Sequence, residues 1–210
     1  MNDPRAFRRI DAAPDPLFYR EPRFVEHIDD GAIAAVTGLY REFFAAGGTV
    51  LDLMSSWVSH LPSEIAYAGV TGLGLNAAEL ARNPRLTARV VHDLNAEPRL
   101  PLEAAAFDAA GMCVSVQYLT RPVEVFADIA RVLRPRAPLV ITYSNRCFPT
   151  KAVAIWQALD ARGQAAYIAG CLRDAGGWDD LAAFDRSPRG GDPLYAVVAR
   201  RTDPSPEVRS

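Results

Sequence analysis

The sequence has no apolar run that approaches the roughly 20 residues needed to span a bilayer. Its opening stretch is polar, carries Arg5, Arg8 and Arg9, and has no apolar segment behind it. A signal peptide needs such a segment, so neither a signal peptide nor a membrane anchor is expected. Internal repeats and low-complexity tracts are also missing. These absences predict a cytoplasmic globular protein without a membrane partner.

Cysteine and histidine are scarce, with three of each in the sequence. Cys113, Cys147 and Cys171 are odd in number and far apart, and no C-x-x-C pair is present. Metal sites and disulfide frameworks both rely on closely spaced ligands or paired cysteines. We therefore expect no metal, no disulfide scaffold and a reducing compartment.

An excess of basic charge is also absent. The chain has 23 Lys and Arg against 25 Asp and Glu, and its net charge is −2. The basic residues are scattered, whereas proteins that bind nucleic acid gather them on one face. A nucleic-acid partner is therefore not expected. The length of 210 residues, half of them hydrophobic, suits one domain with a substantial core.

Apolar residues recur at helical spacing from Phe24 to Phe44, which predicts one or two amphipathic helices that end before Gly47 and Gly48. Beyond them, short apolar runs alternate with helical segments. The expected strands are 49–53, 70–75, 88–92, 107–116, 139–143 and 194–199. The expected helices are 77–82, 123–133 and an inserted helical region over 151–175.

Strands that read as continuous apolar runs and alternate with helices indicate a parallel sheet covered on both faces. The predicted fold class is therefore α/β and doubly wound. Such sheets bind ligands in the loops after the carboxyl ends of their strands. The predicted organisation is an N-terminal helical lid or lead-in over residues 1–48, a main domain over 49–201 and a disordered tail over 202–210.

The loops at the strand ends contain an ordered series of motifs. Val50-Leu51-Asp52-Leu53 comes first and Asp93-Leu94 second; Leu100-Pro101-Leu102 through Phe107-Asp108 and then Val132-Leu133-Arg134-Pro135 follow. In order and spacing this series resembles the class I S-adenosylmethionine-dependent methyltransferases, especially the branch related to ubiquinone and menaquinone biosynthesis (methyltransferase type 11). The resemblance covers roughly residues 49–143. It implies a Rossmann-like, mostly parallel seven-stranded sheet with helices on both faces.

A narrower resemblance lies in three short strings. They are Ser55-Ser56-Trp57-Val58-Ser59-His60, Ser144-Asn145-Arg146-Cys147-Phe148, and the stretch from Phe18-Tyr19 through Pro22-Arg23 to His27-Ile28-Asp29. They resemble a methyltransferase-like subgroup of plants and bacteria with a degenerate glycine loop. This likeness implies the same fold and names no substrate.

The resemblance implies S-adenosyl-L-methionine as cofactor and a small-molecule methyl acceptor as partner. The cationic amino group of the cofactor favours a nearby carboxylate, which Asp52 would supply. Asp93 or its adjacent backbone would accept a hydrogen bond from the adenine amino group. Leu75 and Leu94 would enclose the adenine ring. The predicted cofactor-binding residues are Asp52, Ser55, Ser56, Leu75, Asn76, Asp93, Leu94 and Ser115.

Two departures from the family pattern leave an alternative open. Met54, Ser56 and Val58 stand where the family's three glycines would, although glycine permits positive φ and close ligand approach. Gly74 stands where an acid would bind the ribose hydroxyls, with Asn76 as a substitute donor. The alternative is a catalytically degenerate methyltransferase-fold binding or regulatory protein. A nicotinamide enzyme is not favoured, because no G-x-G-x-x-G follows the first strand.

Several side chains are candidates for the acceptor side. His60 could serve as a general base, or be an ordinary packed histidine, and Tyr118 could face the acceptor or form part of the core. Alignment of acceptor and methyl group can suffice without a base. Tyr19, Arg23, Asn145 and Arg146 are the predicted substrate-binding residues.

The N-terminal residues Tyr19, Arg23 and His27 are expected to form a lid in which Arg23 reaches the cofactor carboxylate, or else to pack on the sheet edge. Trp156 and Tyr167 would shape a wall of the acceptor pocket or belong to the core. The oligomeric state is expected to be a monomer or a homodimer.

Overall fold

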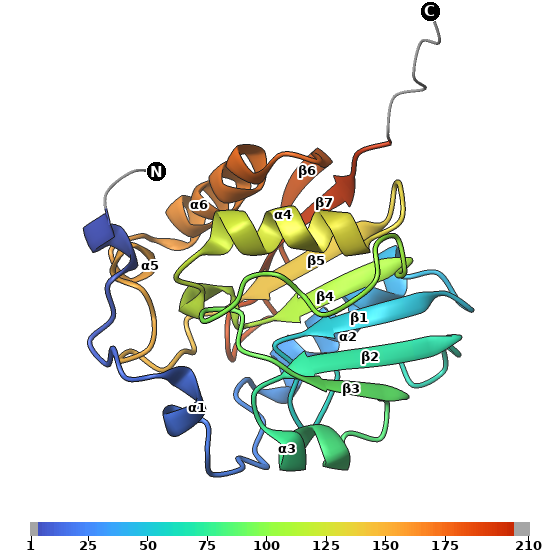
Figure 1. The fold of residues 1–210 in the computed structure, drawn as a ribbon, viewed down its shortest axis with the longest axis horizontal. Coiled ribbons are helices and arrows are strands. Elements are labelled where there is room, and N and C mark those ends of the chain that lie inside the picture. The colour runs from blue at the N-terminus through green and yellow to red at the C-terminus, as the bar shows by residue number, and fades with distance from the viewer. Residues whose placement is uncertain (1–3, 204–210) are drawn as a thin grey trace, which may run out of the picture.

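The computed structural model describes residues 4–203, so residues 204–210 of the predicted tail lie outside the described part. The described residues form one seven-stranded sheet in the order β3-β2-β1-β4-β5-β7-β6 (Figure 1). Strands β1 to β5 pair in parallel, and β7 runs antiparallel to both β5 and β6. This confirms the predicted α/β, Rossmann-like, mostly parallel sheet. The strands are β1 (Thr49–Leu53), β2 (Gly69–Gly74), β3 (Ala88–Val91), β4 (Ala109–Cys113), β5 (Pro138–Tyr143), β6 (Trp178–Asp185) and β7 (Tyr195–Arg201).

Helices cover both faces of the sheet. Against one face lies α2, which Asp29 caps by accepting a hydrogen bond from the Ala32 amide. Helices α4 and α6 pack against each other on the opposite face. The helices are α1 (Asp15–Phe18), α2 (Asp30–Phe43), α3 (Ala77–Arg82), α4 (Pro122–Val132), α5 (Ala154–Gln157) and α6 (Ala161–Ala175), with 3₁₀ turns η1 (Pro4–Phe7) and η2 (Val116–Tyr118). None of the helices in the described part is long and apolar enough to cross a membrane.

Two segments differ from the sequence prediction in ways that matter for the site. Residues 24–28 were expected to be helical, but α2 begins only at Asp30, and the preceding chain runs irregularly past the ends of the strands (Figure 1). The connection from β1 to β2, residues 54–68, contains no helix. Parallel strands are usually joined through a helix whose N-terminus can bind an anion. This chain has no such helix directly after its first strand.

Strand β6 was missed by the sequence prediction. It is an edge strand whose residues are mostly exposed or half-buried, and its register with β7 shifts between Asp179 and Ala182. An exposed strand interrupted by a bulge lacks both the continuous apolar run of a buried strand and a strict alternation. Residues 178–185 therefore form a strand because they pair with β7, and the local sequence does not show this.

Candidate functional site

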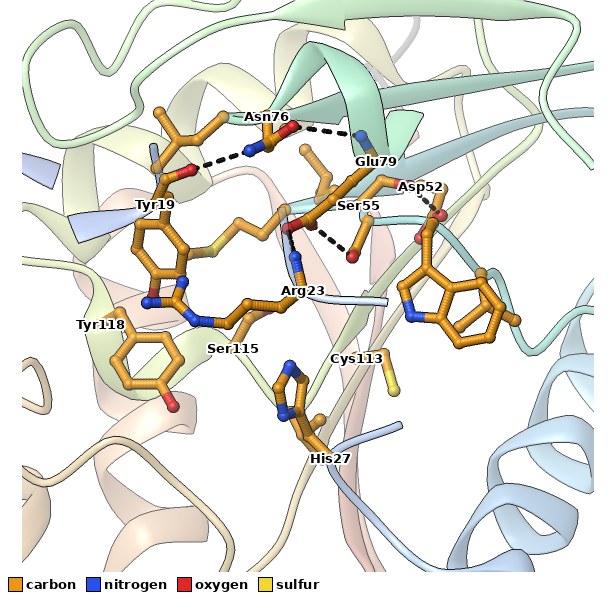
Figure 2. Close-up of a pocket in the computed structure, with 18 of the residues that line it drawn as sticks. Tyr19, Arg23, His27, Asp52, Ser55, Asn76, Glu79, Cys113, Ser115 and Tyr118 are labelled. Carbon is orange, nitrogen blue, oxygen red and sulfur yellow. Dashed lines mark hydrogen bonds between the residues drawn. The ribbon is translucent and has the colours of Figure 1, made fainter. Parts of the chain in front are cut away.

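A cavity of about 500 Å³ lies at the carboxyl ends of the parallel strands β1, β2 and β4. The loops after these strands form one side, and the N-terminal segment from Asp15 to Ile28 forms the other. Every predicted catalytic, cofactor-binding and substrate-binding residue of the sequence analysis lines this cavity. The fold therefore brings the candidates together at one place, and Figure 2 shows how the principal ones lie.

Asp52 lies near the end of β1, with only 8% of its surface exposed. Its Oδ2 accepts hydrogen bonds from the hydroxyls of Ser55, at 2.6 Å, and Ser59, at 2.5 Å. Burial raises the pKa of Asp52 to about 6, against the opposing effect of the two hydroxyl hydrogen bonds. None of the ion pairs among residues 4–203 involves Asp52. A cationic group in the cavity would stabilise its charged form.

The loop after β1 has the conformation of a glycine loop at only one of the three substituted positions. Met54 has φ +53°, whereas Ser56 and Val58 are not among the described residues with positive φ. The left-handed region costs a non-glycine residue about 1 kcal/mol or more. Ser55 then donates its amide to the Leu73 carbonyl, which extends the pairing of β1 with β2. The loop therefore follows its neighbouring strand closely.

This course of the loop explains why β2 ends in a glycine. A Cβ at Gly74 would lie 2.2 Å from the Ser55 carbonyl oxygen, a backbone atom that cannot move aside cheaply. No side chain, and therefore no carboxylate, can occupy position 74 while the loop has this conformation.

The large indole of Trp57 does not block the cavity. Its Nε1 donates to the Val25 carbonyl at 3.0 Å, and its ring packs edge-to-face on Phe24, at 6.4 Å between centroids. Trp57 therefore ties the loop after β1 to the N-terminal segment.

The loops after β2 and β3 form the part of the cavity that is predicted to receive adenosine. Leu75 and Leu94 both line it and supply apolar surface. Asp93 Oδ1 accepts from the amides of Asn95 and Ala96 and so caps a turn. Its Oδ2 has no hydrogen-bond partner among residues 4–203 and is available to a ligand.

Both polar side-chain atoms of Asn76 already make hydrogen bonds within the protein. Its Oδ1 accepts from the amides of Ala78 and Glu79 and caps α3, while its Nδ2 donates to the carbonyls of Tyr19 and Arg20. A ribose hydroxyl would have to displace one of these hydrogen bonds. Asn76 lines the cavity, but its hydrogen bonds favour a structural role that joins α3 to the N-terminal segment.

Arg23 extends from the N-terminal segment into a group of aromatic rings. Its guanidinium lies 4.6 Å from the ring centroid of Phe18, 5.5 Å from that of Tyr19 and 5.4 Å from that of Phe148. Nη2 donates to the Phe18 carbonyl, whereas Nη1 is buried without a hydrogen-bond partner. A buried donor without a partner is costly, so the arrangement favours an anionic ligand at Nη1.

A buried ionic network anchors this segment to the body of the protein. Lys151, the only lysine in the sequence, is fully buried and lies 3.1 Å from Asp15 and 3.2 Å from Asp11. Asp15 also pairs with Arg9 and accepts from Asn95, which follows β3. The N-terminal segment is therefore attached both to the loop after β3 and to the loop after β5.

Three side chains in the cavity wall are suited to proton transfer or hydrogen bonding near neutral pH. Burial lowers the pKa of both His27 and His60, so each imidazole is neutral at pH 7 and can accept a proton. Burial raises the pKa of Tyr118 to about 12, so its hydroxyl stays protonated. That hydroxyl accepts from the Phe148 amide at 2.9 Å and can still donate to a ligand.

The loop after β5 completes the rim of the cavity. Asn145 and Arg146 line it but are exposed, and Arg146 Nε lies 3.7 Å from an Asp192 carboxylate oxygen. Trp156 and Tyr167 do not line it. Both are buried in the core between α5, α6 and the sheet, so the pocket-wall alternative for these two aromatic residues is wrong.

The cavity lining also includes polar residues that were not among the predicted site residues, and four of them bear on its chemistry: His27, Tyr40, Glu79 and Cys113. Tyr40 belongs to the apolar face of α2, where a tyrosine reads as core, yet its buried hydroxyl has no partner. The only sequence signal for Glu79 was an acid in the first turn of the helix that follows the second strand. Burial raises the pKa of Cys113 to about 12, so its thiol is neutral.

A protein-family model for a methyltransferase domain matches residues 55–141. No curated protein matches the sequence. Among solved structures, the [4+2]-cyclase SpnF superposes with a TM-score of 0.63 at 18% identity, covering 90% of this chain and 93% of that one. A Haloferax volcanii structure, of a methyltransferase complexed with the Trm112 methyltransferase activator, gives 0.66 at 16% identity, with 85% and 92% covered.

A third similar structure is the Haemonchus contortus phosphoethanolamine N-methyltransferase 2 in complex with S-adenosyl-L-methionine. It has a TM-score of 0.61 at 13% identity, covering 91% of this chain and 61% of that one. Likeness at such low identity establishes the fold. The chain thus has the fold of class I methyltransferases, and residues 55–141 have the sequence pattern of a methyltransferase domain.

Proposed function

We propose that this protein is an S-adenosylmethionine-dependent methyltransferase that acts on a small-molecule acceptor. The observation behind the proposal is the cavity at the strand ends, where Arg23 Nη1, Tyr40 Oη and Ser115 Oγ are buried without hydrogen-bond partners. Buried polar atoms are usually hydrogen bonded, and three of the nine unpaired side-chain atoms in residues 4–203 belong to residues that line this one cavity, which supports a polar ligand there. A cytoplasmic location and a monomer or homodimer are parts of the proposal that the sequence alone supports.

The cavity residues fit the chemical groups of this cofactor. Asp52 offers a carboxylate to a cationic amino group, and Arg23 offers an N–H to a carboxylate. Leu75 and Leu94 offer apolar walls to a purine, beside the free oxygen of Asp93. When bound, the cofactor supplies an electrophilic methyl group. The volume of about 500 Å³ lies within the range of cofactor and small-molecule sites.

The protein's own contribution to the reaction is to position the acceptor and manage its proton. Neutral His27 and His60 can accept a proton from an acceptor hydroxyl, amine or thiol, and protonated Tyr118 can donate a hydrogen bond that orients it. The N-terminal segment covers the cavity and limits access of water. Alignment of the acceptor with the methyl group provides most of the rate enhancement in such a site.

A second candidate function is a binding or regulatory protein that has lost methyl transfer. It is favoured by the hydrogen bonds that already engage Asp52 and Asn76, and by the Ser55 carbonyl packed against Gly74. The fold alone does not decide between the two candidates, because one similar structure is named as a cyclase.

Calorimetric titration with S-adenosylmethionine and S-adenosylhomocysteine tests the proposal. We expect both to bind with dissociation constants between about 1 μM and 1 mM, the usual range for enzyme ligands. Asp52→Ala should weaken both by about 100-fold, whereas Asp179→Asn, a change on the exposed edge strand β6, should leave binding unchanged. Absence of heat and of thermal stabilisation with either compound would favour the second candidate.

A further inference from the structure

The β2 side of the cavity lacks the acidic group that nucleoside sites in doubly wound folds commonly use. In dinucleotide-binding domains, an acidic side chain near the second strand accepts hydrogen bonds from the ribose hydroxyls. Here β2 ends in Gly74, and the Ser55 carbonyl occupies the space that a side chain would need. A ribose carboxylate must therefore come from another position or be absent.

Glu79 places a carboxylate in this part of the cavity from a different element. It lies in the first turn of α3, is only 8% exposed and lines the cavity. Figure 2 shows its carboxylate directed between Ser55 and Arg23, toward the centre of the site. The side chain thus reaches from the helix after β2 into the cavity that Gly74 also lines.

The hydrogen bonds of Glu79 leave its charge uncompensated. Oε2 accepts from the Ser56 hydroxyl at 2.6 Å, and Oε1 accepts from the Arg23 backbone amide at 2.7 Å. None of the ion pairs among residues 4–203 involves Glu79. A carboxylate oxygen has two lone-pair sites, so each oxygen can accept one more hydrogen bond. A vicinal diol presents two donors and matches this free capacity.

We infer that Glu79 is the residue that binds the ribose hydroxyls of an adenosine-bearing ligand, in place of an acid at the end of β2. The inference rests on the proposed function, since it assumes a nucleoside in this cavity. Glu79 also joins the loop after β1 to the N-terminal segment, through Ser56 and Arg23. Ribose binding at Glu79 therefore acts on the same carboxylate that holds the lid segment against the loop.

If Glu79 has a purely structural role, its substitution should weaken binding equally whether or not the ligand carries both ribose hydroxyls. Analogues that lack one ribose hydroxyl therefore distinguish a structural role from direct binding. The experiment measures dissociation constants of S-adenosylhomocysteine and of its 2′-deoxy and 3′-deoxy analogues by calorimetry. Each ligand is titrated into wild type, Glu79→Gln and Glu79→Ala. A surface variant, Glu103→Gln, serves as the matched control because Glu103 is exposed and lies outside the cavity.

In wild type and in Glu103→Gln, removal of a ribose hydroxyl should weaken binding about tenfold or more, as expected for a hydrogen bond to a charged group. In the Glu79 variants the parent ligand should bind at least about tenfold more weakly, and the deoxy analogues should lose little further affinity. This non-additivity is the signature of a direct contact. Melting temperatures verify folding, and Glu79→Gln keeps the side-chain shape if Glu79→Ala does not fold.

The inference would be overturned if the deoxy analogues lost as much affinity, relative to S-adenosylhomocysteine, in the Glu79 variants as in wild type. It would also be overturned if they lost no affinity in wild type. In both cases binding of S-adenosylhomocysteine itself leaves the proposed function intact. If wild type binds neither S-adenosylhomocysteine nor S-adenosylmethionine, the inference and the proposed function both fail.

Discussion

The two sides of the cavity differ in how far their polar groups are already satisfied. On the β1–β2 side, Asp52 accepts from Ser55 and Ser59, and Asn83 donates to the same Ser59 hydroxyl. On the side formed by the N-terminal segment and the loop after β4, Arg23 Nη1 and Ser115 Oγ have no partner. The polar groups of the first side are therefore satisfied within the protein, whereas those of the second side leave hydrogen-bonding capacity for a ligand.

This difference shows how the loop after β1 can dispense with glycines. A glycine loop brings backbone amides close to a ligand. Here serine hydroxyls and asparagine fix the loop by side-chain hydrogen bonds, and only Met54 needs a left-handed conformation. The cationic contact that a helix N-terminus after the loop would offer is instead available from Arg23, on a separate segment. Under the proposed function, part of cofactor recognition would come from the N-terminal segment instead of from the loop after β1.

The largest expected effect on stability comes from substitution of Lys151, which anchors the N-terminal side of the cavity. In Lys151→Met, the carboxylates of Asp11 and Asp15 lose a buried cationic partner, and removal of one member of a buried pair costs about 3–5 kcal/mol of unfolding free energy. Chemical denaturation measures this loss. The control Arg136→Met removes an exposed pair with Asp180 and should change stability by less than about 1 kcal/mol. Equal effects of the two variants would contradict an anchored lid.

Asp52→Asn should have the next largest effect, and its sign depends on pH. The pKa of Asp52 is raised from 3.8 to about 6 by burial, so the unfolded chain releases this proton first as the pH rises. Wild type therefore loses stability between about pH 4 and pH 6, by roughly 3 kcal/mol in total, and the loss persists above pH 6. Asparagine at this position carries no charge, so the variant does not undergo this pH-dependent loss of stability.

We accordingly expect Asp52→Asn to be more stable than wild type by up to about 3 kcal/mol at pH 8, and to show no such gain at pH 3.5. Denaturation curves at the two pH values measure the difference. The same variant should bind S-adenosylhomocysteine more weakly, which is the usual opposition of stability and function. A gain of equal size at both pH values would show that the charge of Asp52 is not the cause.

The smallest effect is expected for Arg23→Met, which keeps an apolar stem among the aromatic rings and removes the unpaired N–H. Loss of one charge-assisted hydrogen bond should weaken binding of S-adenosylhomocysteine about tenfold. Calorimetry measures it, with Arg20→Met as the control, because Arg20 is exposed and does not line the cavity. Unchanged affinity in Arg23→Met would assign the guanidinium to the acceptor or to the lid.

Much of the fold could be predicted because the buried strands are recognisable in the local sequence as short, continuous apolar runs. Residues 49–53 and 77–82 form the expected strand and helix with the same bounds. The region from Phe24 to Ile28 was predicted wrongly as helical, since its apolar residues have helical spacing. In the structure Trp57 donates to the Val25 carbonyl, and this long-range contact helps hold the segment in an irregular conformation over the cavity.

The candidate site shows the same division. Residues at or just beyond the carboxyl ends of strands, such as Asp52 and Ser115, could be placed at the cavity because the ends of parallel strands meet at one edge. Glu79 and Tyr40 could not, because each lies on a helix whose buried face looks like core in the sequence. Which buried helix face meets a cavity depends on how the helix packs against the sheet.

The amino-acid sequence by itself determined the α/β class, the positions of all strands except β6 and the loops that meet at the site, because apolar periodicity and strand-end positions are local properties. Only the tertiary structure decided that the loop after β1 lies against Gly74, that Glu79 reaches the cavity and that Arg23 keeps an unpaired N–H there. These features depend on contacts between residues tens of positions apart, which no local pattern contains.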